Sequence, residues 1–403
     1  MINLKLKLRI VAMFLGVSVV MQAQIKELEA WMKHPTEELK QQRFARKALS
    51  RDEANAASEL LEEYWRVRMK ADYAEEWSDK QIRYNALKMP FEYRILGDKP
   101  ADGRSLYISM HGGGNAPAEV NDQQWRNQIM LYTPSEGVYI APRAAWNDWD
   151  MWCKPGMDEL LEELIGAAVV YADVNVDKVY LMGYSAGGDG VWRMAPRMAD
   201  TWAAASMMAG HPGNTSQVNL RNLPYMIWMG EQDKAYDRNR LAVERGAVMD
   251  SLQRNDPEGY IHETHIIPQV GHWMLRADTA AVPWMAQYRR QPYPTQIVWR
   301  QEEVVRPSFY WIAAPGEELK TGMRVDVKRN GNQIDILSCD YSSLTLFFND
   351  EMCDLDRPVI VTYRGEKLVR KKLKRTIAQL ESTLNARGDI RYMFPASITV
   401  EIP

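Results

Sequence analysis

The chain has 403 residues, of which 46% are hydrophobic, and its formal net charge is −3. This length allows two or three domains, and the apolar content allows a sizeable core. The near-neutral charge and the lack of a long basic run argue against nucleic-acid binding, so we expect no nucleic-acid partner.

The first residues predict a targeting segment. Three basic residues among the first nine precede an uncharged run of 12 residues, 10–21. This run is shorter than the roughly 20 apolar residues of a membrane-spanning helix. A small residue, Ala23, follows, so we expect a signal peptide over residues 1–23 that is removed near Ala23. The mature protein would then be periplasmic or secreted, with no membrane association; an uncleaved anchor is the alternative.

Residues 24–88 predict a helical N-terminal arm. Ser50 and Glu53 have the spacing of a capping box, in which a serine caps a helix and a glutamate follows three residues later. Apolar side chains then recur at helical spacing over residues 57–65. We expect this arm to pack on the main domain and to carry no chemistry.

Residues 89–292 alternate short apolar runs with amphipathic stretches. Strand candidates are residues 91–96, 106–110, 138–142, 179–183 and 225–230. One intervening helix candidate spans residues 157–172. Strands that alternate with helices imply crossover connections, so this region predicts an α/β fold with a mostly parallel sheet and helices on both faces.

Residues 295–403 predict a small β-rich domain that resembles a sandwich. Asn330-Gly331 lies between two alternating runs, which is a strong hairpin signal. One helix, near residues 375–386, interrupts the strands. This domain could bind carbohydrate or could brace the α/β domain.

The cysteines give little information. Cys153, Cys339 and Cys353 are too few for a disulfide framework, and no Cys/His pattern suggests zinc. Cys339 and Cys353 could pair in an oxidising compartment. We expect neither a cofactor nor a metal, and the sequence does not indicate the oligomeric state.

The strongest chemical signal is a serine between glycines. Ser185 lies in G-x-S-x-G, after the strand candidate 179–183 and before a helix-compatible stretch, as in a nucleophile elbow. The run His111-Gly-Gly-Gly follows another strand candidate. Backbone N–H groups of such a loop can stabilise a developing oxyanion. We expect these donors to come from Gly113 or Gly114 and from Ala186.

A serine nucleophile needs a base and an acid that orients it. His272 follows the strand-like residues 260–267 in a loop, and we favour it over His211. Asp233 follows the strand candidate 225–230, and we favour it over its neighbours Glu231 and Asp237. The chain order Ser, Asp, His is that of the α/β-hydrolase arrangement.

On these motifs, residues 105–290 resemble the α/β-hydrolase superfamily of serine esterases. The likeness is greatest to the polyhydroxybutyrate-depolymerase and feruloyl-esterase group, with some likeness to prolyl oligopeptidase catalytic domains. The resemblance implies a carboxylic ester hydrolase that acts through an acyl-enzyme, with no cofactor. A serine peptidase and a non-catalytic binding protein on the same scaffold are the alternatives.

Aromatic residues suggest the kind of substrate. Five tryptophans lie near the predicted elbow, the base or the strand 138–142: Trp146, Trp149, Trp152, Trp192 and Trp273. Flat rings stack on sugar or phenolic rings, so we expect an esterified carbohydrate or an aryl ester, although core packing explains tryptophan equally well. Asn115 and Asp189 could contact the substrate or could cap local structure.

Overall fold

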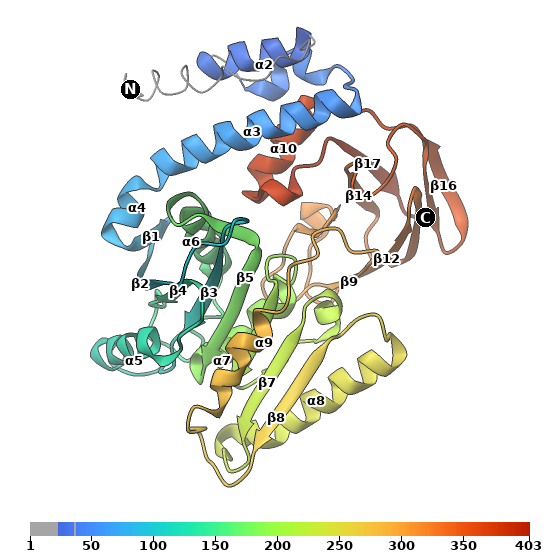
Figure 1. Ribbon diagram of the computed structural model, residues 1–403. Helices are drawn as coiled ribbons and strands as arrows, with labels where there is room; N and C mark the ends of the chain where they lie inside the picture. Colours follow the sequence, from blue (N-terminus) through green and yellow to red (C-terminus); the bar gives the residue numbers. More distant parts are fainter. Residues whose placement is uncertain (1–22, 36–37) are drawn as a thin grey trace.

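The computed structural model describes residues 23–35 and 38–403 (Figure 1). The predicted signal peptide lies outside the described residues except for Ala23, where helix α2 (Ala23–Lys33) begins. The prediction of a cleaved signal is therefore untested. None of the helices in the described ranges is both long and apolar enough to cross a membrane.

An eight-stranded sheet forms the centre of the molecule, in the order β1-β2-β4-β3-β5-β6-β7-β8. The strands are β1 (Gln81–Tyr84), β2 (Leu87–Leu96), β3 (Arg104–Met110), β4 (Gly137–Pro142), β5 (Val174–Tyr184), β6 (Ala204–Met208), β7 (Tyr225–Gly230) and β8 (His262–Ile267). From β4 to β8 all neighbours are parallel, whereas β1 and β2 form an antiparallel edge. The predicted mostly parallel sheet is confirmed.

The sheet is buried on both faces, and successive residues of its central strands enter two different cores. Leu181 of β5 belongs to one core, whereas its neighbours Tyr180 and Met182 belong to the other. The first core also takes residues of α6 (Met157–Tyr171), α7 (Ala186–Arg197) and α8 (Arg238–Asn255). The second lies beside α5 (Ala118–Leu131) and α9 (Ala281–Met285). This burial on both faces explains why the sequences of the strands are continuous apolar runs.

Residues 24–88, which we expected to form a helical arm, contain helices and also a β-strand. Helix α3 (Arg51–Asp72) has the predicted capping box, in which the Glu53 N–H donates to Ser50 Oγ over 3.3 Å. After α4 (Ala74–Asp79), however, the chain forms β1 and turns at Asn85 (φ 52°) into β2. Asparagine tolerates this left-handed conformation, so a tight hairpin replaces the expected continuation of the arm.

The C-terminal region contains two further sheets. The five-stranded sheet consists of β9 (Gln296–Arg300), β12 (Arg324–Asn330), β13 (Gln333–Cys339), β15 (Val359–Tyr363) and β16 (Glu366–Lys371). The four-stranded sheet consists of β10 (Ser308–Phe309), β11 (Ile312–Ala313), β14 (Ser343–Phe348) and β17 (Ala396–Glu401). Helix α10 (Ile377–Arg387) precedes β17. The predicted hairpin is present, because Asn330 pairs with Gln333 across Gly331 (φ 55°).

The cysteines are all buried and unpaired. Cys153, Cys339 and Cys353 are free thiols in the structure. Burial raises the pKa of the Cys339 thiol to about 11. The possible bond between Cys339 and Cys353 is therefore not formed.

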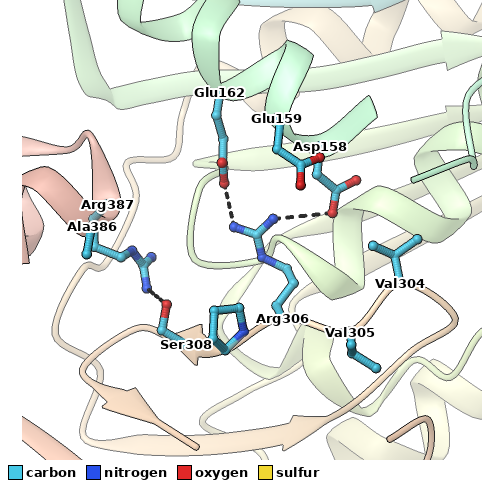
Figure 2. Close-up of a pocket in the computed structure, with 10 residues that line it drawn as sticks. Asp158, Glu159, Glu162, Val304, Val305, Arg306, Ser308, Ala386 and Arg387 are labelled. Atoms are coloured by element: carbon cyan, nitrogen blue, oxygen red, sulfur yellow. Dashed lines mark hydrogen bonds and ion pairs between the residues drawn. The ribbon is translucent and has the colours of Figure 1, made fainter. Parts of the chain in front are cut away.

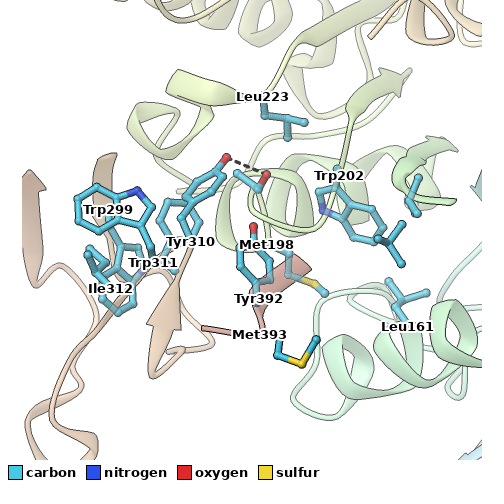
Figure 3. Close-up of a cluster of buried hydrophobic side chains, with 14 of the residues drawn as sticks. Leu161, Met198, Trp202, Leu223, Trp299, Tyr310, Trp311, Ile312, Tyr392 and Met393 are labelled. Carbon is cyan, nitrogen blue, oxygen red and sulfur yellow. Dashed lines mark hydrogen bonds between the residues drawn. The ribbon is translucent and has the colours of Figure 1, made fainter. Parts of the chain in front are cut away.

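A continuous apolar cluster joins the C-terminal region to the α/β part (Figure 3). Tyr310 donates a hydrogen bond to the Ala199 carbonyl over 3.0 Å, and Tyr392 donates one to the Asp200 carbonyl over 2.7 Å. Trp299 and Trp311 are also buried in this cluster. Large aromatic side chains of the C-terminal region thus pack against the α/β part.

Ion pairs of Arg306 and Arg290 also join the C-terminal region to the α/β part. Arg306 donates to Asp158 over 3.2 Å and also pairs with Glu162, so it links the C-terminal region to α6 (Figure 2). Arg290 donates to Asp177 over 2.9 Å and to Asp389 over 2.5 Å. Burial alone would raise the pKa of Asp389, but the charge of Arg290 holds it below its usual value.

Candidate active site

Ser185 occupies a strained turn between β5 and α7. Its backbone has φ 58° and ψ −120°, a conformation that residues other than glycine rarely adopt. A Cβ on Gly183 would lie 2.4 Å from the Gly187 carbonyl oxygen, and a Cβ on Gly187 would lie 2.1 Å from that of Met110. Both glycines of the motif are therefore required by close backbone approach, as in a nucleophile elbow.

The structure brings Ser185, His272 and Asp233 into one hydrogen-bonded chain. The Ser185 Oγ lies 2.8 Å from His272 Nε2, and His272 Nδ1 lies 2.6 Å from Asp233 Oδ2. With the proton on Nδ1, the imidazole donates to the carboxylate and accepts from the serine hydroxyl. Asp233 follows β7 and His272 follows β8, so all three residues lie at the carboxyl edge of the sheet.

Asp233 is buried, whereas His272 is open to solvent on one side. Their side chains are 3% and 43% exposed, respectively. The second carboxylate oxygen of Asp233 lies 3.5 Å from Arg238 Nη1. One carboxylate oxygen of Asp233 thus faces the imidazole and the other faces a guanidinium.

The rival acids have other partners. Glu231 accepts a hydrogen bond from the Gln269 N–H over 2.9 Å and so ties the acid loop to the His272 loop. Asp237 is exposed and pairs with Arg240. Neither carboxylate forms a hydrogen bond with His272 in the described part of the chain.

The rival base, His211, also has a different role. Its Nδ1 accepts the Gly213 N–H over 3.0 Å, and its own backbone N–H donates to Asp189 over 2.6 Å. Burial and the nearby Arg193 lower the pKa of His211. Asp189, a candidate for substrate contact, thus accepts a hydrogen bond from the His211 backbone. Burial raises the pKa of its carboxyl group.

His111 holds the glycine loop beside the serine. Its Nδ1–H donates to the Gly112 carbonyl over 2.6 Å, and its Nε2 accepts the Ala144 N–H over 3.2 Å. Burial lowers its pKa to about 4, so the ring is neutral near pH 7. A Cβ on Gly112 would lie 3.1 Å from the Ser185 Cβ, which shows how closely this loop passes the serine.

The two loop amides that we expected as oxyanion donors differ in their surroundings. The Gly114 N–H donates to Asn121 Oδ1 over 2.8 Å and is therefore occupied. The Gly113 N–H forms no hydrogen bond with any residue that the structure describes. Ala186 is the first residue of α7, where backbone N–H groups have no partner within the helix. Gly113 and Ala186 thus fit the donor role, and Gly114 does not.

Sequence reasoning missed the residues that shape the glycine loop. Asn121 is fully buried, and its Nδ2 donates to the Ala116 carbonyl over 3.1 Å and to Asn147 Oδ1 over 3.0 Å. Arg143 also donates to Asn147. This network joins the glycine loop to the loop after β4. An asparagine in a polar helix carries no sequence signal for such a role.

The tryptophans divide into buried and exposed groups. Trp152 and Trp192 are 0% and 2% exposed, so core packing explains them. Trp149 and Trp273 are 51% and 47% exposed. The Trp149 ring meets that of Tyr236, a residue near Asp233 that sequence reasoning overlooked, with 5.8 Å between centroids.

The remaining predicted contact residues lie on the loops around the site. Trp146 is half-buried, with the Lys154 ammonium 5.6 Å from its ring centroid. Asn115 is exposed and has φ 46°, which suits the turn after the glycine loop. Within residues 23–35 and 38–403, no group of three His, Cys, Asp or Glu residues is arranged to hold a metal ion.

The strand order, the two-sided burial and the elbow define an α/β-hydrolase fold. No family model and no curated protein match the chain. Among solved structures, it is similar to a thermostable esterase (16% identity, TM-score 0.40), over 52% of this chain and 62% of that one, which is less than two thirds of its length. It is also similar to a ferulic acid esterase (16% identity, TM-score 0.36), over 51% of this chain and 96% of the other. A substrate-bound, fluorophosphonate-binding serine hydrolase of Staphylococcus aureus has 14% identity and a TM-score of 0.36, over 51% and 96%.

Proposed function

We propose that the protein is a serine hydrolase that cleaves carboxylic esters through an acyl-enzyme. The observation that carries this proposal is the unbroken hydrogen-bonded chain from Ser185 Oγ through His272 to the buried Asp233. Such a chain gives a serine hydroxyl the base that it needs to attack carbon.

In the acylation step, Ser185 Oγ bonds to the ester carbonyl carbon while its proton moves to His272 Nε2. The carbonyl π electrons become a lone pair on the oxyanion. Asp233 stabilises the imidazolium that forms. When the intermediate collapses, the bond from carbon to the leaving oxygen breaks, and His272 gives its proton to the departing alcohol.

Deacylation repeats these steps with water. His272 Nε2 takes a proton from a water molecule, and the oxygen of that water bonds to the acyl carbon. The bond to Ser185 Oγ then breaks, and His272 returns the proton to the serine. The products are a carboxylic acid and the free enzyme.

The N–H groups of Gly113 and Ala186 supply the oxyanion hole in this mechanism. Each such donor contributes roughly 3–4 kcal/mol to stabilisation of the transition state in acyl transfer. The N-terminal end of α7 adds a favourable dipole for the developing negative charge.

The substrate we propose is an esterified carbohydrate or an aryl ester. Trp149, Tyr236 and Trp273 support this class because their large rings lie exposed on the loops that carry the site. Such rings stack on flat phenolic groups and on sugars.

We also propose that the protein is exported, which the basic and apolar character of residues 1–23 supports. N-terminal sequencing of the mature protein tests the export proposal: an N-terminus near residue 24 supports it, and an intact Met1 contradicts it.

The test is ester turnover by the full chain and by a serine variant. p-Nitrophenyl acetate should give a burst of p-nitrophenol equal to the enzyme concentration, followed by slower turnover. Ser185→Ala should abolish both phases. The control is Ser206→Ala, which removes another buried hydroxyl one strand away. Faster cleavage of peptide anilides than of esters would indicate a peptidase, and equal turnover by Ser185→Ala would overturn the proposal.

A further inference from the structure

Tyr184 connects the two halves of the site. It is the last residue of β5 and lies directly before Ser185. Its hydroxyl donates to the His272 carbonyl over 2.7 Å and accepts the Met274 N–H over 3.1 Å. Its ring also lies against the His272 and Trp273 rings, at centroid separations of 6.0 and 5.7 Å.

The loop that carries His272 is tied to the acid loop at its start, where the Gln269 N–H donates to Glu231, and it has few backbone anchors after Val270. The carbonyl of Val270, two residues before His272, accepts a hydrogen bond from the Gln232 N–H over 2.9 Å. Among the described residues, the backbone of residues 271–274 has two hydrogen bonds to the Tyr184 hydroxyl and one local bond, from the Ala277 N–H to the Met274 carbonyl over 3.0 Å. The loop then passes through Leu275 (φ 54°) and Arg276 (φ 67°). Such left-handed residues persist where the surrounding contacts hold them in place.

We infer that Tyr184 is a positioning residue that sets the distance between the serine hydroxyl and the imidazole. This inference rests on the proposed function. The backbone of Tyr184 places Ser185, and its side chain places His272. One residue therefore holds both reacting groups. Burial raises the pKa of Tyr184 above its usual value, so the hydroxyl keeps the proton that it donates to the His272 carbonyl.

The variant Tyr184→Phe isolates the hydroxyl. It retains the ring but leaves the buried Met274 N–H and the His272 carbonyl without this partner. An unsatisfied buried polar group is costly, so the loop should shift to find other partners. Displacement of a catalytic group by about 1 Å can cost on the order of 100-fold in rate. We expect kcat to fall about 10- to 100-fold while KM stays within about twofold, because Trp149 and Tyr236 lie outside the loop that shifts.

Tyr180→Phe is the matched control. Tyr180 lies four residues earlier on β5, is also buried in the second core, and donates its hydroxyl hydrogen to the Tyr288 carbonyl over 2.9 Å. Its removal deletes a comparable hydrogen bond between a buried tyrosine and a backbone carbonyl. It does not touch the loop of His272.

The experiment measures kcat, KM and the thermal midpoint of the full-length wild type and both variants on p-nitrophenyl acetate. It also measures the rate and the final extent of labelling by a fluorophosphonate. The inference predicts complete but slow labelling and low kcat for Tyr184→Phe, with wild-type values for Tyr180→Phe. Equal kcat in both variants would overturn it. So would a Tyr184→Phe protein that unfolds under conditions where Tyr180→Phe is stable, because the hydroxyl would then act on the fold. A wild type that neither turns over esters nor becomes labelled would contradict the proposed function itself.

Discussion

The carboxyl edge of the sheet and the interface with the C-terminal region use the same residue types in opposite ways. At the sheet edge, Trp149 and Trp273 are about half exposed, and Ser185 has a strained backbone. At the interface, Trp299 and Trp311 are fully buried or nearly so. Polar side chains differ as well, because His272 is open on one side whereas Arg290 is enclosed by its partners.

This contrast fits the proposal that the sheet edge carries out a reaction, while the interface holds two parts of the chain together. A group that must exchange a proton with a substrate needs an open side. A group that joins two parts of a chain gains most from complete burial with its partners. Substitutions at the sheet edge should therefore change rates, and substitutions at the interface should change the free energy of unfolding.

The largest expected effect is on rate at the sheet edge. Asp233→Asn removes the carboxylate that accepts the His272 Nδ1–H, so the imidazole loses the tautomer it needs. We expect kcat for ester hydrolysis to fall by about 10⁴-fold, as in other hydrolases of this type. Asp237→Asn alters an exposed neighbour that pairs with Arg240, and it should keep kcat within about threefold. Similar losses in both variants would mean that the acid has been misassigned.

The next effect is on stability at the interface. Arg290→Met removes a buried cation and leaves Asp389 without its ion pair, whereas Asp177 keeps Arg391 at 3.2 Å. Removing one partner of a buried ion pair typically costs about 3–5 kcal/mol. Urea denaturation should show this loss, while the kcat of the protein that remains folded should equal that of the wild type. A large fall in kcat without a change in the free energy of unfolding would contradict the assignment of a purely structural role to the interface.

His111 lies beside the site but is fully buried, as the interface residues are. It should therefore affect the free energy of unfolding. Its pKa is about 4 in the folded chain, against 6.5 for an ordinary histidine. Between these values the unfolded chain binds more protons, so the free energy of unfolding should fall as the pH is lowered from about 6.5 to about 4.

The buried Asp189 and Asp278 act in the opposite direction, because burial raises their pKa values. The comparison with His111→Gln isolates the histidine. Urea denaturation at pH 7.5 and pH 4.5 should show a smaller fall in the variant than in the wild type. Equal falls would mean that His111 does not contribute to this pH dependence.

The smallest effect concerns substrate choice. Trp149→Ala should raise KM for a feruloylated sugar about two- to tenfold, because ring stacking contributes about 0.5–1.5 kcal/mol. For vinyl acetate, which has no ring, KM should stay unchanged. Steady-state kinetics on both esters provides the measurement, and an equal rise for both would indicate a general packing defect.

Much of this architecture could be predicted from the sequence because local patterns encode it. Short apolar runs marked the strands, and Asn330-Gly331 marked a hairpin. The order of Ser185, Asp233 and His272, each after a strand, was sufficient to place them at one sheet edge. Their catalytic roles remain predictions that the experiments above address.

Other features depended on contacts that are distant in sequence. Asn121 takes the Gly114 N–H, which excludes that amide as an oxyanion donor. Trp152 and Trp192 looked like the exposed tryptophans in sequence but are buried. Strand β1, which pairs with β2, lies within the stretch that we expected to be part of the arm. In each case the local sequence is compatible with more than one structure, and contacts in the folded chain determine which one forms.

The most direct test of the account is to find which atom a fluorophosphonate modifies. Trypsin should release residues 179–193, which contain Ser185, and mass spectrometry of the treated protein can locate the added group. The account predicts one phosphonyl group on Ser185, formed in the wild type and greatly slowed in His272→Ala. Modification at another residue, or equally fast modification of Ser185 without the imidazole, would contradict it.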